Sequence, residues 1–68
     1  MKRKVISLSA MEKLLKGIGA ERVSDSGKEA LRDVLEEKAE EIGKKAWELA
    51  KHSGRKTIRS DDVRLAVR

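Results

Sequence analysis

The sequence contains no cysteine, proline, phenylalanine or tyrosine, and it has one histidine and one tryptophan. Without cysteine the chain forms no disulfide and no thiolate zinc site, and one histidine cannot complete a metal cage. We therefore predict no metal and no cofactor. The same shortages leave no credible pair of nucleophile and base, and no glycine-rich phosphate cradle is present. We accordingly predict no enzyme activity and no small-molecule substrate.

Long hydrophobic runs are absent as well. No stretch approaches the ~20 apolar residues of a membrane span, and the basic start at residues 1–4 is followed by no sustained apolar region such as an export signal needs. We expect no membrane partner and a cytoplasmic location. Leu, Ile and Val account for 16 of 68 residues, only just above the roughly 20% below which a highly charged chain is read as disordered. A single domain over 1–68 is therefore expected to need a partner chain for stability.

The formal net charge of +5 is unevenly distributed. Residues 1–23 carry six basic and two acidic side chains, residues 24–53 carry six and eight, and residues 54–68 carry five and two. The local charges are thus +4, −2 and +3. A fold that gathers the two basic ends on one surface would present the positive stripe of a phosphate-backbone binder.

Glycines and capping residues divide the chain into three predicted helices of short, long and short length. Apolar residues recur at helical spacing within 7–16, and Gly17 ends that run. Ser24 is a favourable N-cap type, and no strong breaker follows until about Ser53, which predicts a second helix of about 29 residues. A third helix is expected to be capped by Ser60.

The apolar stripe of the second helix predicts a dimer. A helix of about 29 residues rises about 43 Å, whereas a compact globule of this chain length spans under roughly 30 Å. Two short helices cover only parts of the stripe, so its centre is expected to meet another chain. Acidic residues such as Glu36 are expected on the solvated face. The predicted dimer core consists of Leu31, Val34, Leu35, Ile42 and Ala46.

Two blocks of sequence resemble the archaeal histones. Residues 19–24 read GAERVS, and residues 50–58 read AKHSGRKTI and are followed by DDVRLAVR at 61–68. The resemblance covers residues 6–68 and leaves 1–6 as a basic N-terminal segment. It implies an all-α histone fold that forms a handshake dimer. It also implies a chromosome-associated protein that bends and compacts double-stranded DNA without reading its sequence.

The resemblance assigns roles to residues in both loops. Arg22 is expected to enter the minor groove while Thr57 of the partner chain holds it, and an arginine suits a narrow groove of negative potential. Arg55 and Lys56 are expected on phosphates. Arg55 has a second interpretation, in which it pairs with Asp62 and braces the loop, and both roles can hold together. The full DNA-binding set is Lys13, Arg22, Ser24, Arg55, Lys56 and Thr57.

The same resemblance implies a contact between dimers. Its expected residues are Leu49, His52, Asp62 and Leu65. The sequence also departs from the family, because no proline precedes the first helix and Lys38 interrupts the apolar stripe of the second. The basic residues Lys2, Arg3 and Lys4 either add phosphate contacts or form a frayed end.

Three questions of function and partner stay open at this level. The native dimer is either a homodimer or a pair with a paralogue. The chain is alternatively one half of a heterodimeric transcription-associated complex. A third possibility is a charged helical dimer that binds protein instead of DNA, which predicts little salt dependence.

Overall fold

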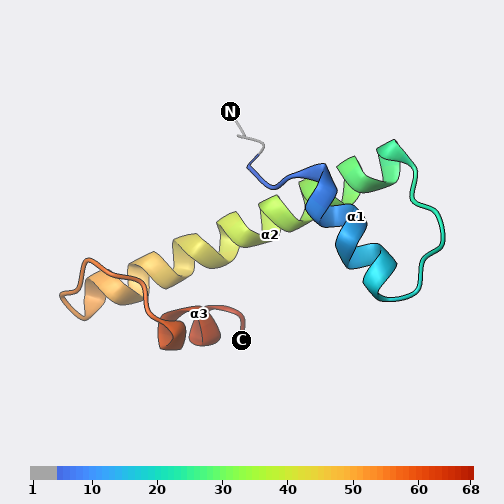
Figure 1. Ribbon diagram of the computed structural model, residues 1–68. Helices are drawn as coiled ribbons and strands as arrows, with labels where there is room; N and C mark the ends of the chain where they lie inside the picture. The colour runs from blue at the N-terminus through green and yellow to red at the C-terminus, as the bar shows by residue number, and fades with distance from the viewer. Residues whose placement is uncertain (1–4) are drawn as a thin grey trace. The chain divides into compact units, whose positions relative to one another are not determined.

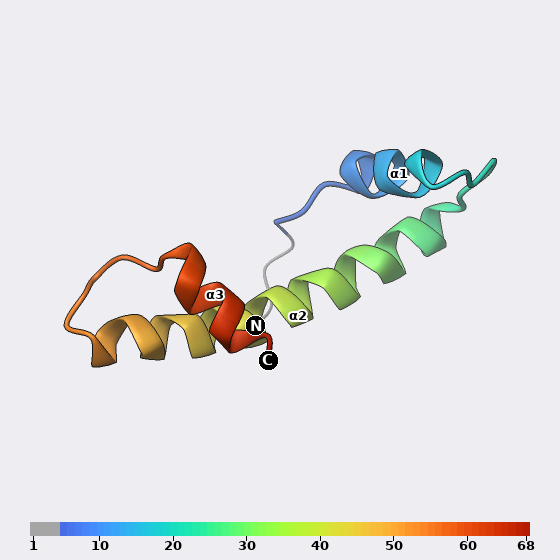
Figure 2. The same ribbon diagram turned by 90° about the horizontal axis from the view of Figure 1, so that it is seen from below.

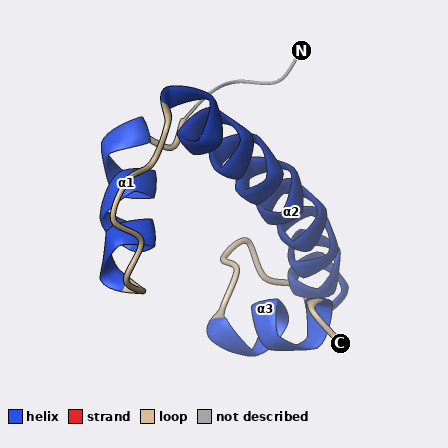
Figure 3. Ribbon diagram, turned by 90° about the vertical axis from the view of Figure 1, so that its right-hand side faces the viewer, coloured by secondary structure: helices blue, strands red, loops and turns tan. Residues whose placement is uncertain are grey.

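The computed structural model of the protein describes residues 5–68, so the predicted roles of Lys2, Arg3 and Lys4 lie outside the described residues. Over this range the chain forms α1 (Leu8–Gly17), α2 (Asp25–His52) and α3 (Ser60–Ala66), joined by loops and without a strand (Figures 1 and 3). The prediction of an all-α protein with a short, a long and a short helix is confirmed. The chain divides after residue 37 into two compact units, which are described separately.

In the first unit, α1 lies alongside the N-terminal part of α2 (Figure 2). Ser7 is the N-cap of α1, and its hydroxyl accepts a hydrogen bond from the amide of Ala10 at 3.1 Å. Met11 is 2% exposed and forms the apolar centre of the unit. The Nζ of Lys28 donates to a carboxylate oxygen of Glu12 at 2.8 Å, which ties α1 to α2.

The first unit also corrects the expected place of Glu36. Its side chain does not lie on a solvated face but is buried. The carboxylate accepts hydrogen bonds from the amides of Val5, at 2.5 Å, and Ile6, at 2.7 Å. Burying a charge is costly unless hydrogen bonds satisfy it. Glu36 therefore fixes the segment that leads into α1, a position where the family's prolines are missing.

Helix α2 has 28 residues, close to the predicted length of about 29. At its start the Ser24 hydroxyl accepts a hydrogen bond from the amide of Gly27 at 3.0 Å, which satisfies one of the free amides of the first turn. At its end Gly54 adopts a φ of 71°, and the amide of Arg55 donates to the carbonyl of Ala50 at 2.9 Å. Glycine is favoured at such a left-handed position because it has no Cβ.

In the second unit, α3 packs against the C-terminal half of α2 (Figures 1 and 2). Small side chains line this contact, since Ala46, Ala50 and Ala66 are all buried. The predicted cap of α3 was wrong, because Arg59 is the N-cap and Ser60 is the first helical residue. The capping bond comes from the third helical position instead, where a carboxylate oxygen of Asp62 accepts the Arg59 amide at 2.8 Å.

Candidate nucleic-acid interface

The loop between α1 and α2 begins with a tight turn. Gly19 adopts a φ of 105°, and its amide donates to the carbonyl of Lys16 at 3.0 Å. The amide of Ala20 donates to the carbonyl of Leu15 at 3.1 Å. Together with the Ser24 cap, these bonds hold both ends of the loop. Arg22 lies between them with an exposed side chain.

The loop between α2 and α3 is held by Arg55. Its guanidinium forms two hydrogen bonds of 2.9 Å to the two carboxylate oxygens of Asp62, and it donates a third of 3.0 Å to the carbonyl of Thr57. Two parallel N–H···O bonds between arginine and carboxylate fix both partners in direction as well as distance. Arg55 is thus turned toward the protein, whereas Lys56 and Thr57 are exposed.

Asp62 is the electrostatic centre of this loop. Its side chain is nearly buried, and the hydrogen bonds from the Arg55 guanidinium and the Arg59 amide lower its pKa from 3.8 to about 2. The same pair raises the pKa of Arg55. Both effects have one cause, because each charged form is stabilised by its partner. The loop brace is therefore fully ionised at neutral pH.

A second ionic cluster lies between α1 and α2 in the first unit. Lys28 reaches Glu12 at 2.8 Å and Asp25 at 3.3 Å. The hydrogen bond from Lys28 lowers the pKa of Glu12, and the one to Glu12 raises the pKa of Lys28. Sequence patterns did not single out this cluster, because Glu12 and Lys28 are 16 residues apart. Lys13, next to Glu12, is exposed and stays outside the cluster.

The structure brings some of the predicted DNA-binding residues together. Arg55, Lys56 and Thr57 share one loop of the second unit. Arg22 and Ser24 share the other loop, and Lys13 lies on α1 in the same unit. Among residues 5–68, the side chains of Lys13, Arg22 and Lys56 take part in no hydrogen bond or ion pair. Each loop therefore carries an exposed, unneutralised cation.

The predicted dimer core is largely uncovered in the single chain. Ala46 is buried, but Val34 is 58% exposed. Leu31, Leu35 and Ile42 are half-buried. The sole aromatic residue, Trp47, is 38% exposed, and the Lys51 ammonium lies 5.6 Å from its ring centroid.

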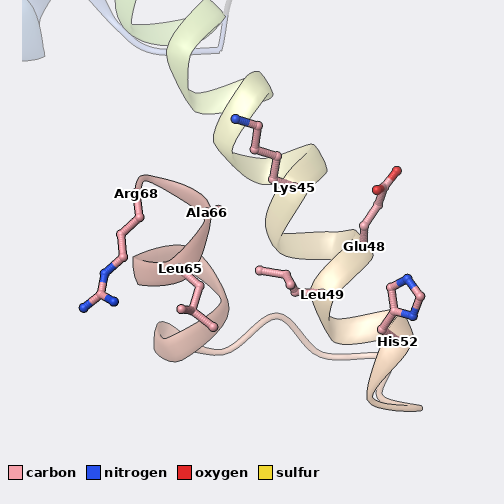
Figure 4. Close-up of a pocket in the computed structure, with 7 residues that line it drawn as sticks. All are labelled: Lys45, Glu48, Leu49, His52, Leu65, Ala66 and Arg68. Carbon is pink, nitrogen blue, oxygen red and sulfur yellow. The ribbon is translucent and has the colours of Figure 1, made fainter.

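Three of the four residues expected between dimers line one cavity of about 310 Å³ in the second unit. Leu49 and Leu65 point toward each other across it, while His52 lies at its rim (Figure 4). Leu65 is 55% exposed. Asp62 does not line the cavity, because its carboxylate is turned toward Arg55.

Neither a metal cluster nor a membrane helix is found in the described part of the chain. No three His, Asp or Glu side chains of residues 5–68 are grouped so that they could hold an ion. Over the same residues no helix is both long and apolar enough to cross a membrane.

The short–long–short helices and the loop blocks define the class of histone-fold proteins. The family model described as histone-like transcription factor (CBF/NF-Y) and archaeal histone matches residues 4–67. One of the two subunits of the archaeal histone HAN1 from Thermococcus zilligii is 49% identical over 63 residues, which cover 93% of this chain and 94% of that protein. "Probable archaeal histone 3" of Methanocaldococcus jannaschii is 45% identical over 56 residues, 82% of this chain and 84% of that protein. The chain belongs to this family of histone-like transcription factors and archaeal histones.

Proposed function

We propose that the chain is a chromatin protein that binds, bends and compacts double-stranded DNA without reading its sequence. Two histone-fold chains form the active handshake dimer. The observation that carries the proposal is the pair of braced loops, because each presents one exposed, unneutralised cation, Arg22 or Lys56. Both relatives are named archaeal histones, which favours a chromatin role over a role in a transcription complex.

The bracing of the loops supports this role. Binding costs less free energy when the contact residues are already ordered. The Gly19 turn and the Ser24 cap order the first loop, and the bond from Arg55 to Asp62 orders the second. A phosphate backbone then meets cations whose positions are set in advance.

The loop geometry divides the work among the proposed DNA-binding residues. Arg22 inserts into the minor groove, where its weakly hydrated guanidinium is attracted by negative potential. The Thr57 carbonyl is bound to Arg55, which leaves the Thr57 hydroxyl to hold the partner chain's arginine. Lys13 and Lys56 contact phosphates, and Ser24 orients the first amides of α2 toward another phosphate. Arg55 acts mainly as the brace.

Dimer formation would cover the exposed stripe of α2. Val34 is more than half exposed, and Leu31, Leu35 and Ile42 are half-buried although they lie on a long apolar face. Covering such a face against a second α2 is a strong driving force for association, about 1.5–3 kcal/mol for each large apolar side chain that becomes fully buried. Ala46, already buried, provides a close contact at the edge of this core.

Filter binding to random-sequence duplex DNA tests the DNA-binding proposal. We expect Arg22→Ala to weaken binding by at least about tenfold near 0.1 M salt, because a dimer loses two charged contacts. Lys44→Ala is the matched control, since it removes an exposed cation of α2 that belongs to neither loop. Equal losses in the two variants would refute the role of Arg22. Undetectable duplex binding by the unmodified dimer would refute the proposed function itself.

The cavity beside α3 supports a further contact between dimers. In a two-fold contact, each dimer presents the same patch to the other. Leu49 and Leu65 would pack at the centre of such a contact, with His52 at its edge. One oxygen of Asp62 accepts a bond only from Arg55, so it keeps the capacity to accept another from histidine.

Nuclease digestion of DNA complexes tests this assembly. We expect His52→Ala to shorten the ladder of protected fragments while single dimers stay bound. Lys51→Ala is a control, because Lys51 is a neighbouring exposed cation that does not line the cavity. Ladders of unchanged length in the His52 variant would refute the contact between dimers and leave the DNA-binding proposal intact.

A further inference from the structure

A second groove of the second unit carries an unbalanced positive charge. Its volume is about 280 Å³, and Ile42 and Val67 contribute apolar surface to it. Three cationic side chains and one carboxylate surround that surface. The lining residues are Lys38, Glu41, Ile42, Lys45, Ala66, Val67 and Arg68. The formal charge of the groove is therefore +2.

The cations of this groove are not neutralised within the chain. Among residues 5–68, the side chains of Lys38, Lys45 and Arg68 take part in no hydrogen bond or ion pair. The single carboxylate, Glu41, can offset only one of the three charges. An apolar surface ringed by free cations favours an occupant that brings both apolar surface and negative charge.

Lys38 lies at the centre of the helix that the dimer would share. Helix α2 extends from Asp25 to His52, so its midpoint falls between Lys38 and Ala39. In a two-fold dimer whose long helices cross at their midpoints, a residue beside the midpoint lies near its own copy. A homodimer thus brings two Lys38 side chains, and with them two positively charged grooves, into the same seam.

We infer that this groove is a partner-selecting surface, and that it favours a second histone-fold chain with an acidic side chain at the position of Lys38 over a copy of this chain. The inference rests on the proposed dimer. Like charges placed together disfavour the homodimer, whereas an acidic partner turns the same contact into attraction. The Lys38 stem still covers apolar surface in either pairing.

A mixing experiment tests the inference with this chain alone. Unmodified protein and a mass-tagged Lys38→Glu variant are unfolded together, refolded at low salt and counted as dimers by native mass spectrometry. Random pairing gives mixed dimers and the mean homodimer in a ratio of about two to one. We expect the ratio to rise about fivefold, which corresponds to about 1 kcal/mol, within the range for exposed or partly exposed ion pairs. The excess should shrink in high salt.

Lys44→Glu is the matched control. Lys44 makes the same charge change on the same helix, but it lies outside the groove and about 120° around the helix from Lys38. Its mixture should pair at random. Random pairing in the Lys38→Glu mixture, or an equal excess in both mixtures, would overturn the inference. Absence of dimers from every mixture would instead overturn the proposed function.

A neutral variant keeps the inference testable if Lys38→Glu does not fold. Lys38→Gln removes the repulsion without adding a negative charge, so its homodimer should dissociate at a several-fold lower concentration than the unmodified homodimer. The single tryptophan offers a fluorescence signal for this dilution experiment. An unchanged or weaker dimer would overturn the inference.

Discussion

Replacing Lys56 by alanine should reduce the salt dependence of DNA binding by a predictable amount. The structure leaves three exposed, unneutralised cations of the proposed interface in each chain, namely Lys13, Arg22 and Lys56. Arg55 is excluded from this count because its charge is paired with Asp62. A homodimer then neutralises about six phosphates, and a slope of about −0.9 per phosphate gives about −5.4 for log affinity against log salt. Lys56→Ala leaves about four contacts and a slope of about −3.6.

These slopes translate into measurable changes of affinity. Between about 50 and 200 mM salt, the unmodified dimer should lose affinity by about 2,000-fold and the Lys56→Ala dimer by about 150-fold. Filter binding across this range determines both slopes, and Lys44→Ala should retain the unmodified slope. An unchanged slope in Lys56→Ala would refute the assignment of Lys56 to phosphate. A steep loss of slope in Arg55→Ala without loss of loop structure would refute the conclusion that Arg55 serves mainly as a brace.

Three further predictions concern the stability of the fold. Ile42→Asp should abolish dimer formation, because it places a charge in the apolar seam, and sedimentation at micromolar concentration would detect any dimer that persists. Glu36→Gln should lower the unfolding temperature by several degrees relative to Glu40→Gln, since two charge-assisted bonds become neutral ones worth about 1 kcal/mol less each; equal melting of the two variants would contradict the anchoring role. Asp62 ionises at a pKa of about 2 when folded and 3.8 ordinarily, so its stabilisation is complete above about pH 3.8 and is lost as the pH falls toward 2. Circular dichroism in acid should therefore show a smaller pH dependence for Asp62→Asn, and an unchanged one for Asp61→Asn.

Local sequence signals predicted the helices well because glycines and caps act over a few residues. Gly17 ends α1 as expected, and Ser24 caps α2. The cap of α3 could not be predicted in the same way. Ser60 is a favourable capping type, but Asp62 is held in place by Arg55 and takes the Arg59 amide instead. A contact between side chains thus moved the helix start by one residue.

The burial of Glu36 shows what periodicity does not contain. Its position on α2 predicts a solvated carboxylate, yet the bonds to Val5 and Ile6 join residues about 30 positions apart. No pattern within one helix encodes such a contact. The candidate DNA-binding residues were found by a different signal, because two blocks of the family sequence coincide with the two loops. Their shared action across a dimer stays a prediction.

Nuclease digestion of the complex with random-sequence duplex DNA tests the central claim most directly, because protection requires that the protein bind and cover DNA regardless of sequence. The account predicts discrete protected fragments that lengthen in equal steps as more dimers join, with the same pattern on unrelated sequences. A continuous smear without protected fragments, or protection confined to one sequence, would contradict it.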